Sequence, residues 1–257
     1  MNRSHEPLFL ESNAENGIVI FIHGFMGSPR QFDKLAEAVH KQGFSAASLL
    51  LPGHGGTAKD FATGTFERWQ TYVDAEIERL SRDYKYILLA GHSMGALLSI
   101  NAAAKYCAHV RGIFTIACPF KITMFSAYTM KVRIKQFFSK KDDPVKVAYL
   151  SNSSVTPSPG IIWNAVGPSA EVKKLTSAAL EKLPEIRVPV TAVYSSSDEL
   201  TSIESLGMLS SGLSGAPFEQ VLLSDSLHAY YPEHEYAMIE NALLKLLSRT
   251  TMNENPL

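Results

Sequence analysis

The segment Gly91-His92-Ser93-Met94-Gly95 lies between a short apolar run and an alanine-rich stretch, and few folds accommodate this arrangement. The run at 86–90 predicts a buried strand, and the stretch at 94–106 predicts a helix. Glycines two residues before and after Ser93 allow a sharp strand-to-helix turn, because no side chain obstructs the close approach of the backbones. Such a turn exposes the serine hydroxyl beside the positive end of the helix dipole. We therefore interpret Ser93 as a nucleophile.

The remaining sequence alternates short β-rich runs with amphipathic patterns. This alternation predicts an α/β fold with a mostly parallel central sheet flanked by helices. Strands are expected at 17–23, 44–51, 86–90, 112–117, 188–194 and 218–223, and helices at 29–42, 65–82, 94–106 and 235–247.

Residues 121–187 interrupt the alternation, since they contain no clear strand and mix short helical patches with polar loops. An insertion of this length between two strands is usually functional. We interpret it as a cap or lid over the carboxyl edge of the sheet. Residues 1–120 and 188–257 would then form one core domain.

A serine nucleophile needs a general base, and the base needs an acid that orients it. In this kind of fold the chain order is serine, acid, histidine. His228 follows the expected strand 218–223 in a short loop and is our candidate for the base. His109 precedes a strand and so lies at the wrong edge of the sheet, and His234 reads as a surface residue at the start of the last helix.

The acid is expected where the preceding strand ends. Asp198 follows the run 188–194 at that position, and the side chain of the adjacent Glu199 is expected to point elsewhere. Asp225, three residues before His228, is the rival candidate, and otherwise it would stabilise a turn. We favour Asp198 because of its place at the end of a strand.

Backbone amides are expected to stabilise the negative charge that develops during acyl transfer. One is the N–H group of Met94, directly after the nucleophile. The second is the N–H group of Phe25, in the loop 23–27 after the first long strand. Together they would form an oxyanion hole.

Composition excludes several other classes of function. With 24 basic and 25 acidic side chains, the chain has no overall charge to bind nucleic acid. Its apolar runs are too short for a transmembrane segment. Cys107 and Cys118 are too few for a disulfide framework or a cysteine metal site, and no metal is expected. Residues 1–16 lack a signal-peptide pattern, so we expect a cytoplasmic protein.

Part of the expected cap is basic and rich in aromatic residues and methionine. Residues 121–146 hold seven basic residues against Asp142 and Asp143. Such a segment allows transient contact with an anionic membrane surface, although a solvated charged face explains the run more often. The apolar side chains suit an acyl chain, and packing against the sheet explains them about as well. They are Met124, Phe125, Tyr128, Met130, Phe137 and Phe138.

Several motifs together resemble the α/β-hydrolase superfamily over nearly the whole chain, and more narrowly its bacterial carboxylesterases and monoacylglycerol lipases. They are His-Gly-Phe-Met-Gly-Ser-Pro at 23–29, Pro-Gly-His-Gly at 52–55, Thr-Phe-x-x-Trp at 65–69, Gly-His-Ser-Met-Gly at 91–95, Ser-Asp-Glu-Leu at 197–200 and Ser-Leu-His at 226–228. The resemblance implies hydrolysis of small-molecule esters through an acyl-enzyme, without metal or organic cofactor.

We therefore expect a serine hydrolase that cleaves short- to medium-chain acyl esters or monoacylglycerol. In this hypothesis Ser93 attacks, His228 carries the proton and Asp198 orients His228. A second hypothesis keeps these residues but acts on a thioester, lactone, amide or carbon–carbon bond. A third is a binding protein with a dormant triad, because the fold alone does not determine function.

Overall fold

The computed structural model describes residues 5–13, 15, 17–123, 126–155 and 161–252, and a seven-stranded sheet runs through them. The strand order is β1-β3-β2-β4-β5-β6-β7, and only the short β1 is antiparallel to its neighbour. The strands are β1 Leu8–Leu10, β2 Ile18–Ile22, β3 Ser45–Leu49, β4 Ile87–His92, β5 Val110–Ile116, β6 Val190–Ser195 and β7 Phe218–Leu223.

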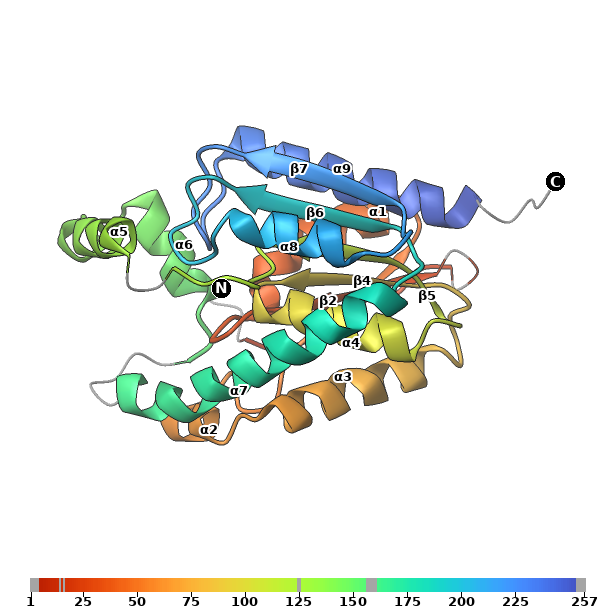
Figure 1. The fold of residues 1–257 in the computed structure, drawn as a ribbon, viewed down its shortest axis with the longest axis horizontal. Helices are drawn as coiled ribbons and strands as arrows, with labels where there is room; N and C mark the ends of the chain where they lie inside the picture. Colours follow the sequence, from red (N-terminus) through yellow and green to blue (C-terminus); the bar gives the residue numbers. More distant parts are fainter. Residues whose placement is uncertain (1–4, 14, 16, 124–125, 156–160, 253–257) are drawn as a thin grey trace.

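Helices cover both faces of this sheet (Figure 1). They are α1 Asp33–Lys41, α2 Ala58–Ala62, α3 Phe66–Leu80, α4 Met94–Lys105, α5 Ala127–Phe138, α6 Pro144–Asn152, α7 Ile161–Lys182, α8 Glu204–Gly212 and α9 Glu233–Met252, with 3₁₀ turns at Pro29–Phe32 and Leu183–Glu185. Within the described ranges, no helix is both long enough and apolar enough to cross a membrane.

Two apolar layers hold the helices to the sheet, because alternate residues of a strand point to opposite faces. Ile18, Ile20 and Ile22 of β2 belong to the core beneath α3, α4 and α7, whereas Val19 and Phe21 belong to the core beneath α1 and α9. All five residues of β2 are buried, which explains why a continuous apolar run encodes this central strand.

The expected α/β class is confirmed, and each predicted strand and helix has a counterpart within a few residues. Sequence patterns did not predict β1, α2 or α8. β1 and α2 span only three and five residues, too few to establish a periodicity. α8 contains Gly207 and three serines, so its helical pattern is weak.

The segment 121–187 consists of two structurally different parts. In α7, Leu175 and Ala179 are fully buried in the core beside α4, so this helix packs as part of the main body. Residues 126–152 comprise α5, α6 and their connection, and we call them the arm. Its helix α5 projects from the body (Figure 1). Met124 and Phe125, which we considered for acyl-chain binding, lie outside the described residues.

Candidate active site

The turn between β4 and α4 has the geometry that its glycines predict. Ser93 has φ 52° and ψ −120°, a conformation that costs a residue with a side chain of the order of 1–3 kcal/mol. A Cβ atom on Gly95 would lie 1.9 Å from the carbonyl oxygen of Ile22, and one on Gly91 would lie 2.3 Å from the carbonyl oxygen of Gly95. Only glycine therefore fits at both positions, and Ser93 is fixed at the carboxyl edge of the sheet.

A first prediction concerns these close contacts. We expect Gly95→Ala to destabilise the protein by about 3 kcal/mol or more, since the added methyl group meets backbone atoms that cannot move aside. Gly207→Ala is the matched control, because nothing lies within 4 Å of its added Cβ atom. In the middle of α8 that change should stabilise by roughly 0.5–1 kcal/mol. Denaturant unfolding measures both, and equal stability of the two variants would contradict this account.

Ser93, His228 and Asp198 form one hydrogen-bonded chain. The Oγ atom of Ser93 lies 3.0 Å from Nε2 of His228, and Nδ1 of His228 lies 2.9 Å from Oδ2 of Asp198. The three residues follow the carboxyl ends of β4, β7 and β6, and all three side chains are largely buried. This arrangement permits transfer of a proton from the serine hydroxyl to the imidazole.

The acid and the histidine stabilise each other's charged forms. Burial alone would lower the pKa of His228, but the charge and hydrogen bond of Asp198, with the charge of Glu199, raise it above its ordinary value. Burial would raise the pKa of Asp198, yet the charge and hydrogen bond of His228 and two backbone amides hold it below its usual range. Those amides belong to Leu200 and Thr201, each 2.8 Å from Oδ1.

The other candidate residues lie away from this chain. The Oδ2 atom of Asp225 is 3.4 Å from Nε2 of His234, and both side chains are about two-thirds exposed. His109 precedes β5, at the opposite edge of the sheet. Of the two aspartates weighed from the sequence, only Asp198 contacts His228 among the described residues.

The backbone of His228 is held at both ends. Nε2 of His92 donates to the carbonyl oxygen of His228 across 2.9 Å, and the Tyr231 hydroxyl donates to the same oxygen across 3.0 Å. Burial lowers the pKa of His92 to about 3, so its ring is neutral at neutral pH. On the other side, the N–H group of His228 donates to Oε2 of Glu199 across 3.0 Å. Our expectation that Glu199 points elsewhere is therefore wrong.

A second glutamate supports the loop before His228. Glu235, in the first turn of α9, accepts hydrogen bonds from the backbone N–H groups of Ser224 and Asp225 and from the Ser226 hydroxyl. These bonds outweigh the effect of burial and lower its pKa to about 2. Sequence reasoning did not find Glu235, although an acidic residue in the first turn of a helix is a recognisable signal.

The loop that carries Phe25 packs against the turn that carries Ser93. A Cβ atom on Gly24 would lie 3.0 Å from the Cβ atom of Ser93, so the two segments approach closely at a position without a side chain. His23 fixes this loop, since its Nδ1 donates to the carbonyl oxygen of Gly24 across 2.9 Å and its Nε2 accepts from the N–H group of Leu51. Met94 is the first residue of α4, so its N–H group has no carbonyl acceptor within the helix.

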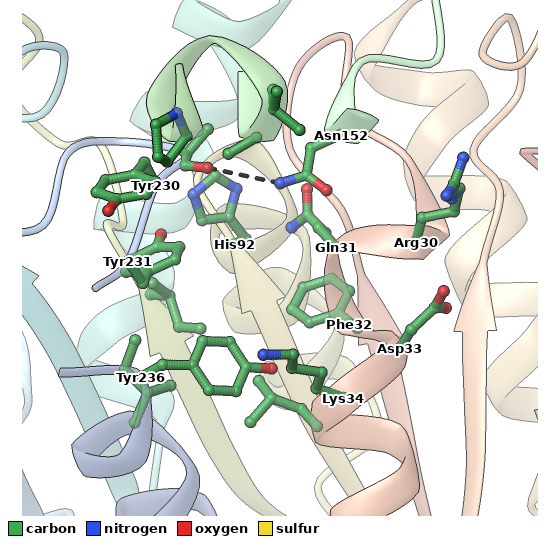
Figure 2. Close-up of a pocket in the computed structure, with 17 residues that line it drawn as sticks. Arg30, Gln31, Phe32, Asp33, Lys34, His92, Asn152, Tyr230, Tyr231 and Tyr236 are labelled. Carbon is green, nitrogen blue, oxygen red and sulfur yellow. Dashed lines mark hydrogen bonds between the residues drawn. The ribbon is translucent and has the colours of Figure 1, made fainter. Parts of the chain in front are cut away.

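A cavity of about 520 Å³ is lined by His92 and by residues of α1, α6 and α9. Figure 2 shows Tyr230, Tyr231 and Tyr236 along one side and Phe32 across from them. Ser93 does not line this space. The cavity therefore lies behind the histidine loop and beneath the arm.

Comparison with known proteins identifies a family and several relatives of this chain. The family model described as Serine aminopeptidase, S33 matches residues 13–235. A thermostable monoacylglycerol lipase of Bacillus sp. (strain H-257) is 25% identical over 253 residues, which are 95% of this chain and 94% of the lipase. A pimeloyl-[acyl-carrier protein] methyl ester esterase of Shewanella oneidensis is 29% identical over 114 residues, 44% of this chain and 40% of the esterase.

Solved structures show the same fold. The structure of Paleococcus ferrophilus monoacylglycerol lipase superposes with a TM-score of 0.71 at 19% identity, covering 95% of this chain and 98% of that one. A structure reported for the metagenome-derived lipolytic enzymes LipS and LipT gives 0.75 at 22% identity, with coverage of 95% and 98%. With a family match over most of its length, the chain is a serine hydrolase of the α/β-hydrolase fold and belongs to the Serine aminopeptidase, S33 family.

Proposed function

We propose that this enzyme hydrolyses carboxylic esters of short- to medium-chain acids or monoacylglycerol, with Ser93 as nucleophile. The observation that carries the proposal is the hydrogen-bonded chain from Ser93 through His228 to Asp198 at the carboxyl edge of the sheet. The ester substrate is supported by the relatives, one of which is named a monoacylglycerol lipase and another a methyl ester esterase.

In the proposed mechanism His228 accepts the hydroxyl proton while Ser93 attacks the ester carbonyl carbon. Asp198 holds the imidazole by Nδ1 and stabilises its protonated form. The N–H groups of Phe25 and Met94 stabilise the carbonyl oxygen as it becomes negative. His228 then protonates the leaving alcohol, and a water molecule, deprotonated by the same imidazole, releases the acid from Ser93.

A panel of p-nitrophenyl esters with two to sixteen acyl carbons tests this proposal. We expect turnover with an optimum at short or medium length, and matched thioester and anilide substrates should react more slowly. The anilide is included because the family description names an aminopeptidase, which would cleave an amide bond. Faster cleavage of the anilide, or no turnover of any ester, would contradict the proposal.

The pH dependence of this reaction is a second prediction. Only the neutral imidazole of His228 can accept the serine proton, and the pKa of His228 is raised above 6.5. The value of kcat/KM should therefore fall as pH decreases through a midpoint above 6.5. Rates measured from pH 5 to 9 test this, and a midpoint well below 6.5 would contradict the assigned environment of His228.

The arm supplies a third prediction, which concerns contact with lipid surfaces. Met130, Ile134, Phe137 and Phe138 recur at helical spacing on α5 and are at least half exposed, and basic residues lie between them along the helix. We infer that α5 contacts anionic membranes transiently. When phosphatidylglycerol vesicles are sedimented, the protein should be found with them in the pellet at low salt and in the supernatant at high salt. The double variant Phe137→Ser/Phe138→Ser should bind weakly, and equal binding to neutral phosphatidylcholine would contradict the inference.

A further inference from the structure

Apolar packing contributes little to the position of the arm. Thr129 is its only buried residue, and the cavity of about 520 Å³ lies beneath α6 (Figure 2). A helix that covers a cavity and buries none of its residues gains little stability from the hydrophobic effect. The few hydrogen bonds between the arm and the body therefore determine where α5 and α6 lie.

Two of these hydrogen bonds meet at Glu199. The Thr129 hydroxyl of α5 donates to the backbone carbonyl of Glu199, and the Tyr149 hydroxyl of α6 donates to Oε1 of its carboxylate. The other oxygen, Oε2, accepts the N–H group of His228. Glu199 is 2% exposed, so both oxygens depend on these protein partners rather than on water.

Glu199 and its neighbour hold the same histidine in different ways. Asp198 binds the ring of His228 through Nδ1, whereas Glu199 binds its backbone. A second contact between arm and histidine loop is weaker, since Nδ2 of Asn152 lies 3.5 Å from the carbonyl oxygen of Ala229 (Figure 2). Glu199 thus connects the arm to the catalytic histidine through its two carboxylate oxygens.

We propose that Glu199 is a positioning residue that couples the arm to catalysis: it fixes the backbone of His228, and Tyr149 and Thr129 fix Glu199. This inference rests on the proposed function for the role of His228. When the arm is displaced, the carboxylate loses the Tyr149 hydroxyl and is free to rotate away from the N–H group of His228. Because small misplacements of a catalytic group reduce the rate strongly, the enzyme is fully active only with the arm seated.

Tyr149→Phe tests the coupling directly, because it removes a single hydroxyl. We expect kcat to fall roughly 3- to 10-fold, as for the loss of one buried hydrogen bond, with KM within about twofold of its original value. Tyr106→Phe is the matched control, since the Tyr106 hydroxyl donates to Glu78 in a similar pair on the surface. That variant should keep the full rate. In a Glu199→Gln background, Tyr149→Phe should have a smaller effect, because the two residues act together.

Glu199→Gln tests the same residue without an activity measurement. The groups that face His228 are Ser93, His92, Asp198, Thr201 and Tyr231 in addition to Glu199. Glutamine keeps an acceptor for the N–H group of His228 but removes a negative charge that favours the protonated ring. The titration midpoint of His228, followed by NMR of labelled histidine and assigned with His228→Gln, should therefore move to lower pH.

The outcomes separate this inference from the proposed function. If esters are not hydrolysed but the His228 midpoint moves in Glu199→Gln, the contact between Glu199 and His228 stands and the ester substrate is wrong. If esters are hydrolysed while Tyr149→Phe matches Tyr106→Phe in kcat and the His228 midpoint is unchanged in Glu199→Gln, the inference is overturned. A fall in melting temperature without any change in kcat or in the titration would likewise reduce Glu199 to a structural contact.

Discussion

Ser93→Ala is expected to lose ester hydrolysis by roughly 10⁴- to 10⁶-fold, with a residual rate from binding and the backbone amides alone. The reason is that no other hydroxyl among the described residues is bonded to Nε2 of His228. A fluorophosphonate probe should label the original protein and not the variant. Retention of labelling or of a substantial rate in Ser93→Ala would place the nucleophile elsewhere. If the folded wild-type protein is not labelled by the probe, a binding role would instead be favoured.

A second substitution at this position separates activity from stability. Ser93 is held at φ 52° and ψ −120°, and alanine keeps the cost of that conformation whereas glycine does not. Ser93→Gly should therefore be inactive and yet more stable than Ser93→Ala by about 1–3 kcal/mol. Denaturant unfolding of the two variants measures this difference. Higher stability of Ser93→Gly would show that the backbone strain at Ser93 costs stability and serves to orient the hydroxyl.

The sequence predicted the parts of this molecule that depend on local pattern. The glycines around Ser93 encode a turn that requires them, and continuous apolar runs encode strands that are buried on both faces. Asp198 and His228 could be selected because each follows such a run, and parallel strands bring their carboxyl ends to one edge of the sheet. The structure joins His228 to Ser93 and Asp198 to His228.

Residues that act through tertiary contacts were beyond the reach of sequence pattern. Glu199 adjoins Asp198, but its contacts with His228 and Tyr149 depend on the path of the chain through an insertion that contains no clear strand and only short helical patterns. The division of residues 121–187 into a projecting arm and a packed helix has the same origin. Apolar residues occur in both parts, so composition does not show that Leu175 is buried and Phe137 is exposed. That difference depends on tertiary packing.

The assignment of the acid supports the last prediction. We expect Asp198→Asn to lower kcat by roughly 10³- to 10⁴-fold, because an amide neither stabilises the protonated imidazole nor maintains the required tautomer. The amide can still accept the N–H groups of Leu200 and Thr201, so the turn itself should persist. Steady-state kinetics on the preferred p-nitrophenyl ester measures the loss, and circular dichroism checks the fold.

Asp225→Asn is the matched control for that experiment, since both aspartates were candidates from their sequence positions and only their surroundings differ. The Asp225 carboxylate is exposed and pairs with the exposed His234, an interaction that contributes little to stability. Its replacement should leave kcat within about twofold. A large loss in Asp225→Asn with a mild effect of Asp198→Asn would mean that the loop after β7 rearranges in solution to bring Asp225 onto His228. The hydrogen bonds that Ser224, Asp225 and Ser226 donate to Glu235 oppose that rearrangement, because they hold this loop in place.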